Sequence, residues 1–292
     1  MIIVKLMGGL GNQMFQYATG LALARKHNVP FRADLNFLLD RRKRYYEFTQ
    51  RKYALDIFAE PPEAADDREI KRFLYPRHGN RYVYHALKRL YGEKNVYRED
   101  DVRTVPDFFS LPSEAYLDGY WQNPGYFSSI AEELRVRFAP ANGLPASHQE
   151  LWRRIKGSAS VCLHVRKGDY VGHPELDVLD PDYYYRAIER LSEKVSEPRF
   201  FVFSDDIGWC RENLRTDAAR TVFVDTFPGE KAEYDFRLMS ECRHFIIGNS
   251  TFSWWGAWLG NDPRKIVIAP KRWSRSQEEE VSSTLEKDWT AL

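Results

Sequence analysis

The stretch Val161-Cys-Leu-His-Val-Arg-Lys-Gly-Asp-Tyr170 decides how the second half of this chain of 292 residues folds. An apolar run that ends in charged residues is typical of a buried parallel strand, and parallel sheets bind ligands at the carboxyl ends of their strands. Arg166 carries a fork of donors that matches a pair of phosphate oxygens. Gly168 lets the backbone approach a ligand because it has no Cβ atom. The stretch predicts a strand with an anion-binding end; a surface ion pair between Arg166 and Asp169 is the alternative.

Strands and helices alternate through the rest of this half. Apolar residues at helical spacing predict helices, and continuous apolar runs such as Phe200-Phe-Val-Phe203 predict strands covered on both faces. The predicted strands are 161–165, 199–203, 221–224, 245–248 and 265–269, and the predicted helices are 181–195, 207–214, 231–242 and 252–259. This alternation predicts an α/β fold with a parallel sheet.

The first half begins in the same way. The pattern predicts a strand over 1–6, a glycine-rich turn and a helix over 12–27, then strands at 31–33 and 116–120 and a helix over 126–138. Residues 36–115 show no clean periodicity. Proline and glycine cluster before the next helix, so a domain boundary fits near 140–158. We divide the chain into residues 1–150 and 151–292.

Composition narrows the class of protein. Forty-three Lys and Arg oppose 42 Asp and Glu, and a net charge of +1 gives no support to a nucleic-acid partner. Aromatic residues reach 15%, which fits sugar stacking as well as an ordinary core. The three cysteines are scattered in apolar segments, so they predict no disulfide framework and fit a reducing compartment.

Membrane signals are weak. No stretch approaches the ~20 apolar residues of a spanning helix, and the first residues do not form a signal peptide, so a soluble cytoplasmic protein is expected. The basic run Arg41-Arg-Lys-Arg44 indicates either a solvated face or a patch that faces an anionic membrane or a lipid-linked substrate. The second interpretation would place the protein peripherally at the inner face of the membrane.

Polar side chains follow four of the five predicted strands of the second half. They are His164, Arg166 and Asp169, then Ser204, Asp205 and Asp206, then Asp225, and finally Asn249, Ser250 and Ser253. Because the carboxyl ends of parallel strands meet at one edge, these residues predict a binding edge. Two groups also have a structural alternative. Asp205 can cap the helix that follows it, and the start of the helix after Asn249 can be capped or can attract a phosphate.

Metal binding is the weaker interpretation of the carboxylates. Asp180-Pro-Asp182 has the spacing of a metal site, but a proline at the first helical turn favours an N-cap. His173 has no partner at ligand spacing. The residues therefore do not favour a metal site.

The turn Gly8-Gly-Leu-Gly11 lies between a strand and a helix and is similar to a dinucleotide-binding fingerprint. Asp34 stands near the place of the ribose-binding acid, but Met14 occupies the position of the third glycine. Asn12 and Gln13 offer side chains at the helix start instead. This turn keeps an NAD-dependent oxidoreductase open as a rival function.

Taken together, the motifs resemble glycosyltransferase family 11, the bacterial α-1,2-fucosyltransferases. They occur in the family's order across nearly the whole chain, and residues 40–110 carry no matching motif. The matches are Gly8-Gly-Leu-Gly-Asn-Gln13 with Met14-Phe-Gln16, Gly119-Tyr-Trp-Gln122, His164-x-Arg-x-Gly-Asp-Tyr170, Phe203-Ser-Asp-Asp206, Leu238-Met-Ser-x-Cys242 and Asn249-Ser-Thr-Phe-Ser-Trp-Trp-Gly256.

The resemblance implies a GT-B-like α/β fold, with two Rossmann-like domains that face each other across a cleft. The C-terminal domain would hold GDP-β-L-fucose, and the N-terminal domain would receive the acceptor. The implied reaction moves L-fucose, with inversion, to the 2-hydroxyl of a galactose-containing glycan. It needs no cofactor or metal, and its setting is the assembly of a bacterial surface polysaccharide such as O-antigen.

The resemblance also assigns residues. Arg166 would hold the leaving diphosphate, with Asp169 as the second catalytic candidate. The donor-binding set is Gly11, Asn12, Gln13, His164, Ser204, Asp205, Asp206, Asn249, Ser250 and Ser253, and the acceptor-binding set is Tyr120, Trp121 and Gln122. The general base stays open among Asp169, Glu175 and Asp34, and Asp169 can instead hold Arg166 in place. A non-catalytic glycan-binding protein is the second rival.

Overall fold

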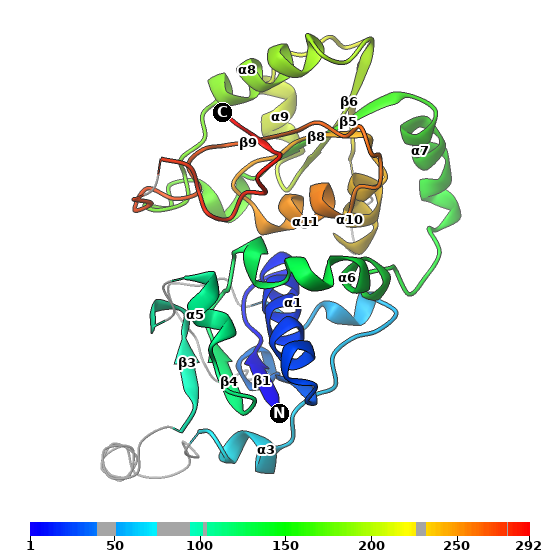
Figure 1. The fold of residues 1–292 in the computed structure, drawn as a ribbon. Helices are drawn as coiled ribbons and strands as arrows, with labels where there is room; N and C mark the ends of the chain where they lie inside the picture. Colours follow the sequence, from blue (N-terminus) through cyan, green and yellow to red (C-terminus); the bar gives the residue numbers. More distant parts are fainter. Residues whose placement is uncertain (40–50, 75–93, 102–103, 226–231, 279) are drawn as a thin grey trace. The chain divides into compact units, whose positions relative to one another are not determined.

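The structure is a computed structural model that describes residues 1–39, 51–74, 94–101, 104–225, 232–278 and 280–292 (Figure 1). The chain divides into two compact units, Met1–Ala141 and Asn142–Leu292. The division lies within the predicted stretch 140–158 but before residue 150, because helix α7 (Ala146–Lys156) packs on the second unit. The basic run at 41–44 lies outside the described residues.

A parallel sheet with the order β2-β1-β4-β3 forms the centre of the N-terminal unit. Its strands are β1 (Ile2–Lys5), β2 (Phe31–Asp34), β3 (Val96–Arg98) and β4 (Ala115–Asp118). Helix α1 (Leu10–His27) follows β1 and is buried along most of its length, which explains its many small and apolar residues. It ends at Asn28, whose left-handed backbone (φ 51°) suits asparagine at this position.

Short elements fill the region without periodicity. These are α2 (Asn36–Leu39), α3 (Asp67–Lys71), α5 (Val105–Phe109) and the 3₁₀ turns Leu55–Ile57 and Glu99–Asp101. The predicted helix over 126–138 is an α-helix in its second part, α6 (Ala131–Arg137), after the 3₁₀ turns Pro124–Tyr126 and Ser128–Ile130.

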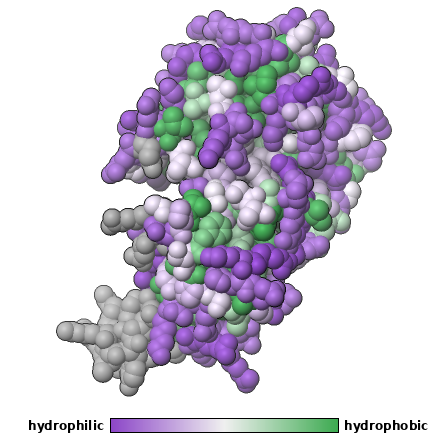
Figure 2. Space-filling model, in the orientation of Figure 1, coloured by the Kyte–Doolittle hydropathy of each residue, from purple (hydrophilic) through white to green (hydrophobic). Residues whose placement is uncertain are grey.

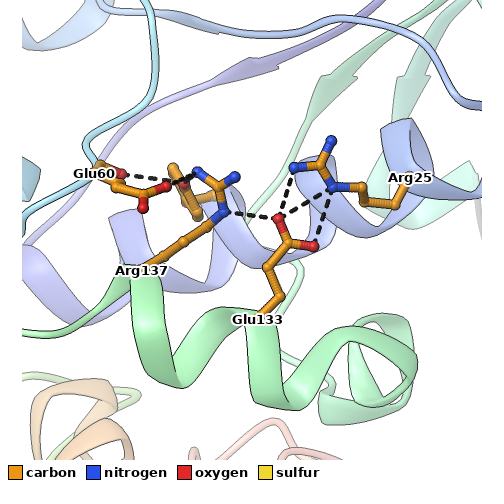
Figure 3. Close-up of polar contacts among 5 residues, drawn as sticks. Arg25, Glu60, Glu133 and Arg137 are labelled. Atoms are coloured by element: carbon orange, nitrogen blue, oxygen red, sulfur yellow. Dashed lines mark hydrogen bonds and ion pairs between the residues drawn. The ribbon is translucent and has the colours of Figure 1, made fainter.

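A network of charges joins α6 to α1 (Figure 3). Arg25, in the last turn of α1, places Nη2 2.6 Å from Oε1 of Glu133, and Nε of Arg137 donates to the same oxygen at 2.8 Å. Arg137 also places Nη1 2.8 Å from Oε2 of Glu60. One carboxylate thus receives two guanidinium groups, which lowers the pKa of Glu133 through the hydrogen bond from Arg25 first, with a further contribution from Arg137.

The C-terminal unit contains a parallel sheet with the order β10-β9-β8-β5-β6-β7. Its strands are β5 (Ala159–Val165), β6 (Pro198–Ser204), β7 (Thr221–Phe223), β8 (His244–Ile246), β9 (Val267–Ala269) and β10 (Thr290–Ala291). The five predicted strands are confirmed. The two-residue strand β10 was not predicted, because it is too short to show a pattern.

Helices cover both faces of this sheet (Figure 1). On one face, α8 (Pro181–Ser192) and α9 (Ile207–Asn213) pack on alternate β5 residues, Val161, Leu163 and Val165. On the other face lie α7, α10 (Ala232–Ser240) and α11 (Thr251–Leu259). Burial on both faces is the reason that β5 and β6 are continuously apolar.

The surface of this unit is polar where it is seen in Figure 2, with hydrophilic residues predominating. Cys162, Cys210 and Cys242 are buried and free of disulfide bonds. Among the described residues, no helix is both long and apolar enough to cross a membrane.

Candidate functional site

Arg166 is the first residue after β5, and two carboxylates hold its guanidinium group. Nη1 lies 2.9 Å from Oδ2 of Asp205, and Nη2 donates to Oδ1 of Asp169 at 2.5 Å. The guanidinium also lies over the ring of Tyr170, 5.4 Å from its centre. The side chain is 22% exposed, so it is held in place but reachable. The predicted ion pair with Asp169 exists, as one part of a cluster that orients a cation at the carboxyl edge of the sheet.

Asp205 fastens the loop after β5 to the end of β6. Its Oδ1 accepts a hydrogen bond from the backbone N–H of Lys167 at 2.9 Å. A Cβ atom on Gly168 would lie 2.2 Å from Oδ2 of Asp205, so glycine is required for this close approach. Both carboxylate oxygens of Asp205 are therefore engaged within the protein, and its expected place beside the nucleoside stays a prediction.

Asp206, and not Asp205, caps α9. Its Oδ1 accepts from the backbone N–H of Trp209 at 2.9 Å. The hydroxyl of Ser204 accepts from the backbone N–H of Asp206 at 3.0 Å. The side-chain acceptors of the segment after β6 thus bind backbone N–H groups at the start of α9, as expected for a strand that leads directly into a helix.

His164 is a neutral side chain beside this cluster. It is 5% exposed, and burial, with a smaller contribution from Arg166, lowers its pKa to about 3. Its ring packs on Phe252, with 6.0 Å between ring centres, and its Nδ1 atom has no hydrogen-bond partner among the described residues. A neutral imidazole can exchange a hydrogen bond with a ligand, but it cannot supply positive charge to a phosphate.

The segment before α11 uses two of its polar side chains internally. Nδ2 of Asn249 donates to the carbonyl oxygens of Leu176 and Trp273, each at 2.9 Å. The fully buried hydroxyl of Ser253 donates to the carbonyl of Ser250 at 3.0 Å. The side chains of Asn249 and Ser253 therefore brace loops and the helix start, and the expected contact of these residues with phosphates stays a prediction. The positive end of the α11 dipole, next to Ser250, is what this segment offers to an anion.

The glycine-rich turn of the N-terminal unit is held by a buried amide. Nε2 of Gln13 donates to the carbonyl oxygens of Gly8 and Lys52, each at 2.9 Å, and its Oε1 accepts from the N–H of Ala54 at 3.0 Å. Gln13 is fully buried and Gly11 is buried as well. The expected donor contact of Gln13 is thus corrected: this side chain frames the turn.

Asn12 and Gln122 meet at the carboxyl edge of this first sheet. Nε2 of Gln122 donates to Oδ1 of Asn12 at 3.0 Å, and both residues are half-buried. Tyr120 is half-buried too, and its backbone N–H donates to Oε2 of Glu99 at 2.7 Å. Burial, with a smaller contribution from Glu99, raises the pKa of the Tyr120 hydroxyl.

Trp121 belongs to the core. It is fully buried between Phe108 and Tyr126, with ring centres 5.7 and 5.8 Å away. Its left-handed backbone (φ 57°), which is rare for a bulky residue, turns the indole inward. No ring face is left for a sugar, so the expected stacking of Trp121 on the acceptor is corrected.

The carboxylates considered as a general base are all engaged. Asp34 is 4% exposed and accepts from the Tyr116 hydroxyl at 2.7 Å, and its roles as base or ribose-binding acid stay predictions. Glu175 accepts from the backbone N–H of Ser276 at 3.0 Å, and hydrogen bonds from Ser276 lower its pKa. Asp180 caps α8 through the N–H of Tyr183, as predicted. The described residues contain no cluster of His, Cys, Asp and Glu that could hold a metal ion.

Residues that the sequence did not single out add charge to both edges. Nζ of Lys167 lies 4.5 Å from the centre of the Trp209 ring, so a second cation neighbours Arg166. In the N-terminal unit, Nζ of Lys5 lies 2.8 Å from Oδ1 of Asp118, at the carboxyl ends of β1 and β4. Applying the strand-end rule to the first half of the chain would have found this pair.

Two parallel-sheet units of this kind define the GT-B-like class of α/β folds. The solved structure of NodZ α-1,6-fucosyltransferase soaked with GDP-fucose matches with a TM-score of 0.51 at 15% identity, over 91% of this chain and 94% of that one. A likeness at this identity establishes the fold. The fold class predicted from the motifs is confirmed.

The sequence model of glycosyl transferase family 11 matches residues 1–292, and the chain belongs to that family. An α-1,2-colitosyltransferase of Escherichia coli is 32% identical over 100% of this chain and 98% of its own length. A galactoside α-(1,2)-fucosyltransferase 2 of Hylobates lar is 27% identical over 88% of this chain and 68% of its own. The protein is an enzyme, a glycosyltransferase, and the predicted family is confirmed.

Proposed function

We propose that the protein transfers L-fucose from GDP-β-L-fucose to the 2-hydroxyl of a galactose-containing glycan, with inversion at the anomeric carbon. Family membership and two α-1,2-transferring relatives support the linkage. The observation that carries the proposal is the position of Arg166, held by two carboxylates at the carboxyl end of β5.

The chemistry asks for positive charge at that edge. As GDP leaves, negative charge develops on the β-phosphate while the sugar becomes oxocarbenium-like. A fixed donor aimed at that charge contributes about 3 kcal/mol to catalysis. A guanidinium has five N–H donors, so the two contacts of Arg166 with Asp169 and Asp205 leave others for phosphate oxygens. The neighbouring Lys167 and the backbone N–H groups at the start of α11 add to the same field.

Asp169 acts as a positioning residue in this proposal. Its short contact with Arg166, made through Oδ1, orients the guanidinium. The acceptor glycan binds through Tyr120 and Gln122, and Asn12, which accepts a hydrogen bond from the Gln122 amide, contacts the donor. Trp121 supports these residues from the core and does not touch the sugar.

A related donor is the second candidate, because the colitosyltransferase matches the whole chain. Colitose is fucose without its 3-hydroxyl group. A site that hydrogen-bonds this hydroxyl would reject the deoxy sugar by a factor on the order of 10⁴, whereas a site that ignores it would accept both donors.

One assay tests the proposal and the choice of donor. The purified protein is incubated with GDP-fucose or GDP-colitose and a panel of galactosides, and linkage analysis identifies the products. We expect an α-1,2-fucosylated galactoside from GDP-fucose and at most a trace from GDP-colitose. Efficient transfer of colitose with no transfer of fucose would replace the proposed donor, and transfer to neither would overturn the proposal.

Two further measurements address the rivals and the metal. GDP should raise the Tm while NAD leaves it unchanged, and the opposite result would favour the oxidoreductase. Release of GDP from GDP-fucose in the presence of acceptor separates the enzyme from a glycan-binding protein. EDTA should leave the rate unchanged; loss of activity that Mn²⁺ restores would bring back Asp180 and Asp182 as metal ligands.

A further inference from the structure

A cavity lies at the amino edge of the C-terminal sheet, opposite the edge that carries Arg166. Its volume is about 680 Å³, and it opens where β5, β6 and β7 begin, beside the end of α7. This volume is that of a ligand pocket. Strand β5 is seven residues long, so roughly 20 Å of strand separates the cavity from Arg166. The cavity is therefore distinct from the candidate donor site.

Arginine dominates the charge of this cavity, which we call the arginine pocket. Its charged wall residues are Arg153, Arg154, Arg199 and Arg220 with Glu150 and Glu197. Four arginines and two glutamates give the wall a charge of +2, although the whole chain carries +1.

Interactions within the protein account for part of this charge. Arg153 donates to Glu150 at 3.1 Å, and Nε of Arg220 lies 3.6 Å from Asp217. Within the described residues, Arg154 and Arg199 form no ion pair. Arg153 and Arg154 also complement the dipole at the end of α7. The helix dipole does not explain the presence of Arg199 and Arg220, because Arg199 lies at the start of β6 and Arg220 directly precedes β7.

The turn that forms one wall is strained. Glu197 has a left-handed backbone (φ 49°) and precedes Pro198. A residue before proline is normally extended, so this conformation is unfavourable on two grounds. Strained backbone of this kind collects at binding sites, where the surrounding structure maintains it.

We propose that the arginine pocket binds a phosphate-bearing anion, either a small soluble one or the headgroup of an anionic lipid. Guanidinium groups from a helix and two strand ends match the bidentate geometry of phosphate oxygens. The polar, half-open wall provides no aromatic surface for a sugar or a base, so phosphate is the group it recognises.

The test measures pyrophosphate binding by calorimetry in an Arg166→Ala background, which removes the proposed donor contact. We expect one equivalent of pyrophosphate to bind. Adding Arg154→Ala and Arg199→Ala should weaken binding at least about tenfold, because two charge-assisted contacts are lost. The matched control adds Arg186→Ala and Arg190→Ala instead, which remove the same charge from the exposed face of α8.

The control decides between a site and general attraction. The proposal is supported if the affinity for pyrophosphate stays within about twofold in the α8 variant (Arg186→Ala, Arg190→Ala) but is lost in the pocket variant (Arg154→Ala, Arg199→Ala). Equal losses in both variants, or no binding in the Arg166→Ala background, would overturn it. Circular dichroism and the Tm of each variant exclude unfolding as the cause.

A second arm identifies the source of the phosphate. The same proteins are sedimented with phosphatidylcholine vesicles that contain or lack phosphatidylglycerol. The pocket binds a lipid headgroup if the protein binds the anionic vesicles, if pyrophosphate inhibits this binding, and if the Arg154→Ala and Arg199→Ala substitutions abolish it. Pyrophosphate binding without vesicle binding assigns it to a soluble anion. Vesicle binding that persists in the pocket variant excludes the pocket as the membrane contact.

Discussion

Both sheets are parallel, but different side chains organise their carboxyl edges. In the N-terminal unit, buried neutral amides organise the edge: Gln13 holds the glycine-rich turn, and Gln16 joins the N–H of Met7 to the carbonyl of Gly119 at 3.0 and 3.1 Å. In the C-terminal unit, charges organise the edge, and Arg166 stays 22% exposed while Gln13 is fully buried. Full burial of an ion is costly, whereas a hydrogen-bonded amide is buried at little cost. Buried amides therefore frame the first edge, and the second edge keeps a charged side chain within reach of solvent.

Removing the positive charge of Arg166 should have the largest effect among the tests of this difference between the two edges. Arg166→Ala should lower kcat by about 100-fold or more, because a fixed donor to the leaving phosphate is lost. Steady-state kinetics with GDP-fucose measure the loss, and circular dichroism shows that the fold persists. Arg186→Ala, on the exposed face of α8, is the control and should keep its activity. Activity within a few-fold of the unmodified protein would remove Arg166 from the mechanism.

Removing the buried amide of Gln13 should lower the stability of the fold instead of the turnover. Gln13→Ala leaves two carbonyls and one N–H without their partner, so the free energy of unfolding should fall by about 2–3 kcal/mol. Urea titration measures the change. Gln122→Ala, which removes a half-buried amide with one contact, should cost less than about 1 kcal/mol. A Gln13 variant of unchanged stability would show that the frame is not held by this side chain.

Neutralising Asp169 sharpens the distinction between positioning and proton transfer. Asp169→Asn should lower kcat/KM by about tenfold or less, the scale of a partly exposed ion pair, and should leave the acid limb of the pH–rate profile in place. The profile is recorded from acid to neutral pH for both proteins. A loss on the order of 1,000-fold together with the disappearance of that limb would make Asp169 the general base.

The smallest effect concerns the charge network of Arg25, Glu133 and Arg137 in the N-terminal unit. Hydrogen bonds from Arg25 and Arg137 place the pKa of Glu133 below its ordinary value of 4.5. The ionised carboxylate therefore stabilises the fold at neutral pH, and this stabilisation is lost as the pH falls through the lowered pKa. Glu133→Gln should reduce the free energy of unfolding by about 1 kcal/mol or less at pH 7, because the pair is partly exposed.

Urea titrations at neutral pH and well below 4.5 check this prediction. The difference between the two proteins should shrink in acid, where Glu133 is protonated in both folded and unfolded chains. A difference that is constant with pH would mean that the packing of Glu133 matters and its charge does not.

The sequence predicted the C-terminal sheet well because its strands are buried on both faces, which makes Val161–Val165 and Phe200–Phe203 continuously apolar. Strand β3 and helices α3 and α5 are too short to show a period, so the region 36–115 could not be divided. The same limit applies to β10.

The site was predicted by position more accurately than by role. The strand-end rule placed Arg166, Asp169 and Asp205 together, because parallel strands bring their carboxyl ends to one edge. It could not show which polar atoms would be used inside the protein. Asn249 and Trp121 make contacts with residues distant in the sequence, and only the folded chain brings those partners within reach.

The lack of space beside Gly168 limits which residues can occupy this position in the loop after β5. An alanine there would place its methyl group against the carboxylate of Asp205, and the displaced carboxylate would release Arg166 and the N–H of Lys167 together. Adding one carbon at position 168 should thus lower turnover more than it lowers the free energy of unfolding. Gly143, which has open space around its Cα, would accept the same carbon without consequence. In a saturation library selected for activity, position 168 should return glycine while position 143 returns a broad mixture.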